Sequence, residues 1–242
     1  MDFEKSAWAS DKFAGNYIDR ADVYIPERSR MLRLLDSVAR TLHGDRRGLR
    51  VTDLGCGDGI VTAVLLGRDP SINATLVDAS EGMLARARRR LDGYGHCSFV
   101  QASFDDLIEG RARLPQSDLV VSSMAIHHNE MPQKRALFKL IFGSLDAGGS
   151  FINMETVKPL TPGLERLYFS LWSEAMQAGM TRAGIADEKP QDVIDRYIDP
   201  KSQNRPDTLE DQLDALRDSG FENVDSYYKS GIFAIFGGQR PK

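Results

Sequence analysis

The stretch VTDLGCGDGI, residues 51–60, decides the fold. Its β-branched and apolar start is typical of a buried strand, and apolar residues resume after it at the spacing of a helix. Three glycines at alternate positions, Gly55, Gly57 and Gly59, separate the two patterns. In open α/β sheets, ligands bind where such a loop joins the carboxyl end of a strand to the next helix. The stretch therefore predicts a ligand site on bare backbone.

The rest of the chain alternates short apolar runs with amphipathic stretches, which is typical of βαβ units. We therefore expect an α/β fold: a Rossmann-like, seven-stranded, mostly parallel sheet with helices on both faces and a helical cap insertion. Strands are expected within residues 49–55, 72–79, 97–102, 118–124 and 150–156, and an antiparallel pair within 224–239. Helices are expected within residues 26–44, 60–67, 80–93, 133–145, 161–180, 191–198 and 206–221.

The length of 242 residues suits a single domain, residues 1–242. Residues 1–25 are expected to form an N-terminal lid segment. The βα rhythm stops at residue 157, and residues 157–206 are expected to form a helical cap insertion. In the last helix, Asp207 and Glu210 have the spacing of a capping box, which predicts the start of that helix.

The composition is that of an ordinary globular protein, with 41% hydrophobic and 27% charged residues. No apolar run approaches the roughly 20 residues of a membrane span, and the first residues do not resemble a signal peptide. With only two cysteines, these features predict a cytoplasmic protein without a membrane partner. The net charge of −4 argues against DNA and disfavours RNA as a partner. The arginine-rich stretch 86–91 is expected to face solvent, and a homodimer stays open.

The glycine loop departs from two phosphate-binding patterns. A dinucleotide fingerprint needs a glycine where this chain has Ile60, and no Lys-Ser or Lys-Thr follows the loop as in the Walker pattern. Asp53 instead precedes the glycines, where its carboxylate could pair with an amine. Asp78 ends the next strand, where a carboxylate can accept hydrogen bonds from ribose hydroxyls. A ligand with a ribose, an amino-acid end and no phosphates is S-adenosyl-L-methionine.

Five successive segments carry a family resemblance: VTDLGCGDG, LVDASEGMLARAR, FVQASFDDL, DLVVSSMAIHH and AGGSFINME. In order and spacing they resemble the motifs of class I S-adenosylmethionine-dependent methyltransferases, over about residues 45–156. The resemblance implies methyl transfer from S-adenosyl-L-methionine, with S-adenosyl-L-homocysteine as product. The cofactor-binding residues that we expect are Tyr17, Asp53, Gly55, Cys56, Gly57, Asp78, Ala79, Met83, Ser103, Phe104 and Ser122. Many family members carry an aspartate where this chain has Ser103.

The layout of the whole chain is similar to that of carboxy-S-adenosylmethionine synthase-like members of this family, which belong to the wobble-uridine pathway of tRNA. Their Leu-Gln-Phe after the fourth strand is absent, and Ala125, Ile126 and His127 stand there. The segment 207–216 is acidic where those enzymes have basic residues near the extra carboxylate. We therefore favour ordinary methyl donation.

Methyl transfer requires in-line positioning of a nucleophile, and a base is needed only where the acceptor arrives protonated. His127 follows the fourth strand, and we expect it to be the catalytic base, although packing against the strand end is an equal alternative. An acceptor under the cap is expected to contact Tyr24, His128, Glu155, Phe169 and Trp172. The segment HHNE, residues 127–130, offers too few suitably directed ligands for a metal site, so we expect no metal.

We therefore expect an enzyme that methylates an oxygen, nitrogen or sulfur atom of a small-molecule acceptor by in-line displacement. One alternative is a carboxy-S-adenosylmethionine synthase-like enzyme linked to tRNA. A second is a protein that binds S-adenosylmethionine without catalysis, and a third is a dehydrogenase.

Overall fold

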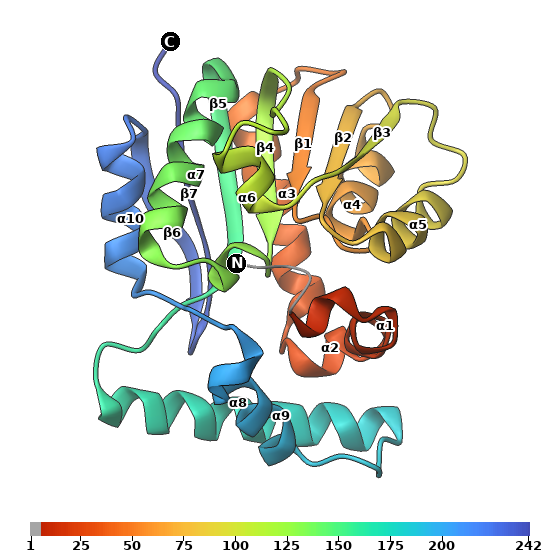
Figure 1. Ribbon diagram of the computed structural model, residues 1–242, viewed down its shortest axis with the longest axis vertical. Helices are drawn as coiled ribbons and strands as arrows, with labels where there is room; N and C mark the ends of the chain where they lie inside the picture. The colour runs from red at the N-terminus through yellow and green to blue at the C-terminus, as the bar shows by residue number, and fades with distance from the viewer. Residues whose placement is uncertain (1–5) are drawn as a thin grey trace.

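A computed structural model describes residues 6–242 of the chain. A seven-stranded sheet forms its centre, in the order β3-β2-β1-β4-β5-β7-β6. Figure 1 shows the strands side by side with helices in front and behind. The strands are β1 (Arg50–Leu54), β2 (Asn73–Asp78), β3 (Cys97–Gln101), β4 (Ser117–Ser123), β5 (Leu145–Thr156), β6 (Glu222–Ser230) and β7 (Phe233–Gln239).

Strands β1 to β5 pair in parallel, and β7 pairs antiparallel with both β5 and β6. Central strands of such a sheet are buried on both faces, which explains the continuous apolar runs in their sequences. β4, for example, is buried over Ser117–Ser122. The order reverses between β1 and β4, which is the point where open α/β sheets bind ligands.

Helices cover each face of the sheet and bury one hydrophobic cluster there. The first cluster lies between the sheet and α3 (Arg28–His43), α4 (Ile60–Arg68) and α5 (Glu81–Arg90), and it continues into the cap. The second lies between the sheet and α6 (Phe104–Ile108), α7 (Met131–Ser144) and α10 (Leu209–Asp218). The loop that carries the glycines thus stands on a rigid base.

The cap and the N-terminal segment lie together across the carboxyl ends of the parallel strands (Figure 1). The cap consists of α8 (Pro162–Ala183), α9 (Pro190–Ile198) and the 3₁₀ turn η4 (Pro200–Ser202). The N-terminal segment consists of η2 (Ala7–Ala9), α1 (Asp11–Asp19) and α2 (Ala21–Tyr24). Residues 1–5 of the expected lid lie outside the described residues.

The predicted fold class and the order of strands and helices are confirmed. Two local predictions differ from the structure. Thr208, and not Asp207, caps α10, because its hydroxyl accepts the N–H of Asp211. A short helix, α6, follows Ser103 where we expected none. Within residues 6–242, no helix combines the length and apolar character needed to cross a bilayer.

Candidate active site

The glycine loop is held against the neighbouring strand by its backbone. The N–H groups of Gly55 and Cys56 donate to the carbonyl oxygen of Val77, at 2.8 and 3.1 Å. Gly55 has a φ of +69°, and a Cβ there would lie 2.4 Å from the Cβ of Ala125. The position therefore requires glycine for two reasons, backbone conformation and space.

Asp78 joins the glycine loop to the next helix. Its carboxylate accepts the N–H of Gly57 at 2.8 Å and the N–H of Ser80 at 2.9 Å. Burial raises the pKa of the Asp78 carboxyl, and these backbone donors oppose that effect. The carboxylate lines the cavity beside the loop, so Asp78 both shapes the loop and faces a ligand.

Asp53 lies beneath the loop and is fully buried. One oxygen accepts the hydroxyl of Thr62 at 2.7 Å and the N–H of the same residue at 3.3 Å. The other oxygen, Oδ1, is buried without a hydrogen-bond partner within the described part of the chain. Burial raises the pKa of Asp53 to about 7. A buried carboxylate with an unused oxygen is suited to a cationic ligand group.

A first cavity of about 1080 Å³ opens beside this loop, at the carboxyl ends of β1, β2 and β4. Most of the predicted cofactor residues line it together. They are Tyr17, Gly55, Cys56, Gly57, Asp78, Ala79, Met83, Ser103 and Phe104.

Two predicted cofactor residues lie elsewhere. Asp53 is one layer below the lining, as described above. Ser122 points away from the cavity, because its hydroxyl donates to the carbonyl oxygen of Leu54 at 2.7 Å inside the sheet. Its neighbours Ser123 and Met124 line the cavity in its place.

Ser103 lines the cavity, but its hydroxyl is already used. It donates to Asp106 at 2.7 Å and accepts the N–H of that residue at 3.1 Å, which caps α6. The hydroxyl and the backbone N–H of Ser103, which both donate to the Asp106 carboxylate, lower its pKa together with Arg111 to about 2. The residue thus positions Phe104 at the cavity and has little polar capacity left for a ligand.

A second cavity of about 1000 Å³ lies between the cap and the N-terminal segment. Four residues line both cavities: Trp8, Tyr17, Ile25 and Met124. The two spaces therefore adjoin at these four residues. A group at the end of the first cavity could meet a second molecule where the two cavities join.

His127 lines the second cavity and is held by Glu155. Its backbone N–H donates to one oxygen of Glu155 at 2.9 Å, and its Nδ1 contacts the other at 2.5 Å. Glu155 is fully buried and also accepts the N–H of Thr156 at 2.8 Å. The carboxylate fixes Nδ1 as the protonated nitrogen, which leaves Nε2 as the basic one.

Glu155 was expected to face the acceptor. The structure places it behind His127, outside the lining of the second cavity, because its whole carboxylate is used to orient the histidine and the strand end.

His128 packs against the ring of His127, with the ring centroids 4.1 Å apart, and lines the first cavity. Its ring packs against Trp8, with the ring centroids 5.4 Å apart. Burial, followed by the charge of His127, lowers the pKa of His128 well below its ordinary value. The residue is therefore a neutral part of the cavity wall and not a base.

Tyr24 and Trp172 line the second cavity and join the N-terminal segment to the cap. The indole N–H of Trp172 donates to the carbonyl oxygen of Tyr24 at 2.8 Å, and the Tyr24 hydroxyl donates to Glu188 at 2.6 Å. Phe169 differs from expectation: it lies outside the lining and supports Trp172 from behind, at 6.1 Å between ring centroids.

Sequence reasoning missed Trp8, Arg28 and Tyr197, which line one or both cavities. Arg28 is the one arginine or lysine that lines the first cavity within the described residues. It begins α3, and no local pattern marks a helix start as part of a site. The aromatic character of the N-terminal segment was a usable signal for Trp8.

The arginine-rich stretch on α5 is largely neutralised by nearby acids. Arg86 pairs with Asp19, Arg88 with Glu81, and Arg90 with Asp58. Since Asp58 lines the first cavity, the last of these pairs also removes a free charge from the site.

Residues 51–149 match the family described as a methyltransferase domain. The chain is 25% identical over 190 residues to the carboxy-S-adenosyl-L-methionine synthase of Campylobacter curvus, a match that covers 77% of this chain and 75% of that protein.

Solved structures share the fold. An O-methyltransferase family protein from Burkholderia thailandensis superposes with a TM-score of 0.68 at 17% identity, over 99% of this chain. This chain spans 63% of that protein's length. Magnesium protoporphyrin IX methyltransferase from Synechocystis, solved with bound S-adenosylhomocysteine, has a TM-score of 0.59 at 19% identity. That match covers 95% of this chain and 96% of the other.

Proposed function

We propose that this chain is a class I S-adenosylmethionine-dependent methyltransferase and that it methylates a hydroxyl group of a small molecule. The observation that carries the choice of a hydroxyl is the His127–Glu155 pair, 2.5 Å apart, at the edge of the second cavity. A hydroxyl must lose its proton during transfer, and this pair is a base oriented for that purpose.

The first cavity fits S-adenosyl-L-methionine on observations of this chain. Gly55 and Gly57 line the cavity without side chains, which lets a ligand approach their backbone closely. The carboxylate of Asp78 lines the cavity and is suited to ribose hydroxyls. Asp53 lies one layer below, and its charge can attract an amine there without direct contact. Arg28, whose guanidinium also pairs with Asp22 at 2.9 Å, supplies the positive charge that a carboxylate requires.

When bound, S-adenosyl-L-methionine supplies a methyl group already activated by a sulfonium. The chain's own residues then have two tasks. His127 Nε2 accepts the hydroxyl proton, while Glu155 stabilises the imidazolium that results. The aromatic residues of the lid and cap hold the acceptor in place and exclude water.

The proposal is tested by incubating the protein with S-adenosyl-L-methionine and matched acceptors that differ only in bearing a hydroxyl, an amine or a thiol. Mass spectrometry should find a methylated product from the hydroxyl acceptor. His127→Ala should lower turnover about 10²- to 10⁴-fold and leave S-adenosylhomocysteine affinity within twofold. Full turnover in this variant would refute the assignment of the base.

A second candidate function is synthesis of a carboxylated S-adenosyl nucleoside, which the similarity to the Campylobacter protein favours. The products separate the two candidates. Methyl transfer releases S-adenosylhomocysteine, whereas the alternative produces a nucleoside heavier than S-adenosylmethionine by one carboxyl group. We favour methyl transfer because an imidazole base oriented by a carboxylate faces the second cavity.

A further inference from the structure

The second cavity has two aromatic walls that come from different parts of the chain. Trp8, Phe13 and Tyr17 of the N-terminal segment form one wall, in which the ring of Trp8 lies 5.4 Å from that of Phe13 and 5.0 Å from that of Tyr17. Trp172 and Tyr197 of the cap belong to the other, 5.3 Å apart. Within each wall the rings stand edge to face, at 77° to 86°, so each wall offers ring faces and ring edges against which an aromatic ring can pack.

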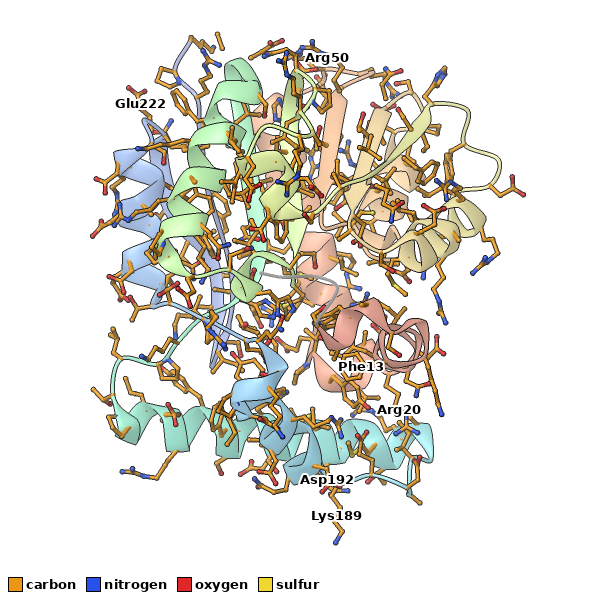
Figure 2. The ribbon with its side chains drawn as sticks, viewed as in Figure 1. Phe13, Arg20, Arg50, Lys189, Asp192 and Glu222 are labelled. Carbon is orange, nitrogen blue, oxygen red and sulfur yellow. The ribbon has the colours of Figure 1, made fainter. Side chains whose placement is uncertain are left out.

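The wall of the cap includes Phe233 of β7, whose ring lies 5.7 Å from that of Trp172. The phenols of both walls stay neutral, since burial raises the pKa of Tyr17 to about 12 and also raises the pKa of Tyr197. Figure 2 shows Phe13 and Arg20 near the cap, at the other end of the molecule from Arg50. The lining between the two aromatic walls is therefore mainly apolar, and His127 also belongs to it.

One group of lining residues is polar, comes from the end of α9, η4 and the turn after it, and is called the polar end of the cavity here: Arg196, Asp199, Lys201, Ser202 and Asn204. Most of its groups already have partners. Arg196 pairs with Glu188 at 2.5 Å, and Asn204 and Ser202 both donate to the carbonyl oxygen of Tyr197. Asp199 accepts the N–H of Lys201 at 2.8 Å, which caps η4.

The Lys201 ammonium is the exception at this end. Lys201 is an exposed residue that lines the cavity, and within residues 6–242 no hydrogen bond, ion pair or ring contact holds its ammonium. The Asp199 carboxylate also lines this end, but the η4 backbone engages one of its oxygens. An ammonium without a partner at the mouth of an apolar cavity can gain a charge-assisted hydrogen bond from a ligand anion.

We propose that the acceptor is a planar aromatic ring that carries the hydroxyl to be methylated and, toward the cavity mouth, an anionic group such as a carboxylate that Lys201 binds. The inference rests on the proposed function and names its substrate class. It assigns Lys201 as a specificity-determining residue, with the aromatic walls selecting the ring.

The test uses the full chain saturated with S-adenosylhomocysteine and a series of phenols. Each phenol carries a carboxylate, a primary carboxamide or an amine, attached to the ring directly or through a short alkyl chain. Calorimetry should show that the best carboxylate binds at least tenfold more tightly than its carboxamide. Lys201→Glu should reverse the order and favour the amine. Asp199→Asn should tighten carboxylate binding, because it keeps the cap of η4 and removes the opposing charge.

Lys139→Glu is the matched control, since this exposed lysine lies on α7 and not in the cavity lining; it should change none of these ratios. Equal binding of carboxylate and carboxamide, absence of binding by all the phenols, or an unchanged preference in Lys201→Glu would overturn the inference.

Methylation with S-adenosylmethionine is then measured on the same series. A carboxylate that binds through Lys201 but is not methylated would sink hydroxyl methylation and leave the ligand class standing. Methylation at equal rates of the carboxylate, carboxamide and amine phenols would support hydroxyl methylation and overturn the role of Lys201.

Discussion

The carbonyl oxygen of His127 accepts the backbone N–H of Arg205 at 2.7 Å, which ties the loop of the imidazole to the segment on which the cap returns to the sheet. Lys134 holds that segment from below. Its fully buried ammonium donates to the carbonyl oxygen of Arg205 and to the carboxylate of Asp207, both at 2.5 Å. The position of His127 thus depends on the segment by which the cap returns to the sheet.

Lys134→Met should destabilise the fold by about 2 to 4 kcal/mol, because it strands the carboxylate of Asp207 and the carbonyl of Arg205. Urea unfolding measures this change. Arg135→Met, next along the helix, removes an exposed pair with Asp218 and should cost less than about 1 kcal/mol. Equal costs for the two variants would show that the buried pair is not the stronger one.

Affinity for S-adenosylhomocysteine should rise with pH up to about 7 and then level off. Burial raises the pKa of Asp53 to about 7, so the carboxylate is neutral below that pH and negative above it. Only the negative form attracts an ammonium, and the gain is at most about tenfold per pH unit. Calorimetry between pH 5.5 and 8.5 measures it, and Asp53→Asn should flatten the curve.

A further prediction concerns the effect of Asp53 on the stability of the protein without ligand. A carboxyl whose pKa is higher in the folded than in the unfolded state costs stability as pH rises from about 4 through 7. Asp53→Asn should therefore raise the melting temperature at pH 8 more than at pH 5. The opposite order would contradict a buried, destabilising charge at this position.

Gly55→Ala should abolish cofactor binding and destabilise the fold by about 1 to 3 kcal/mol, since a Cβ would lie 2.4 Å from that of Ala125 on strained backbone. Gly67→Ala is the control. A Cβ at Gly67, in α4, would have no neighbour within 4 Å, and this change should stabilise the helix by about 0.5 to 1 kcal/mol. Thermal melts with and without S-adenosylhomocysteine separate the two effects.

Asp78→Ala should weaken S-adenosylhomocysteine binding at least tenfold, because it removes the carboxylate at the cavity and releases the N–H groups of Gly57 and Ser80. Calorimetry at pH 8 measures the loss, and a circular dichroism spectrum checks the fold. Asp45→Ala, in an exposed turn before β1, should bind as the original protein does. Unchanged affinity in Asp78→Ala would remove this residue from the site.

Glu155→Gln should lower kcat about 10²- to 10⁴-fold with little change in KM, since the amide keeps the size of the side chain but cannot stabilise an imidazolium. S-adenosylhomocysteine affinity should stay within twofold, because Glu155 lies outside the first cavity. Glu165→Gln, exposed on α8, should leave both constants as they are.

The strand order and the glycine loop could be predicted because periodicity and turn chemistry are local properties of the sequence. Gly55 and Asp78 follow that logic, since each marks the end of a strand at one sheet edge. The role of Glu155 could not be predicted, because it depends on a pairing with His127 across separate elements. Arg28 reaches the cavity because of how α3 packs, and no local pattern in the sequence predicts that packing.

The lining residues shared by the two cavities have a thermodynamic consequence. Four residues line both cavities: Trp8, Tyr17, Ile25 and Met124. A shift of these side chains toward one cavity changes the shape of the other, so binding in one cavity alters the affinity of the other for its ligand. Thermodynamic linkage makes this effect reciprocal. If the bound nucleoside changes the affinity for the acceptor by some factor, the bound acceptor changes the affinity for the nucleoside by the same factor.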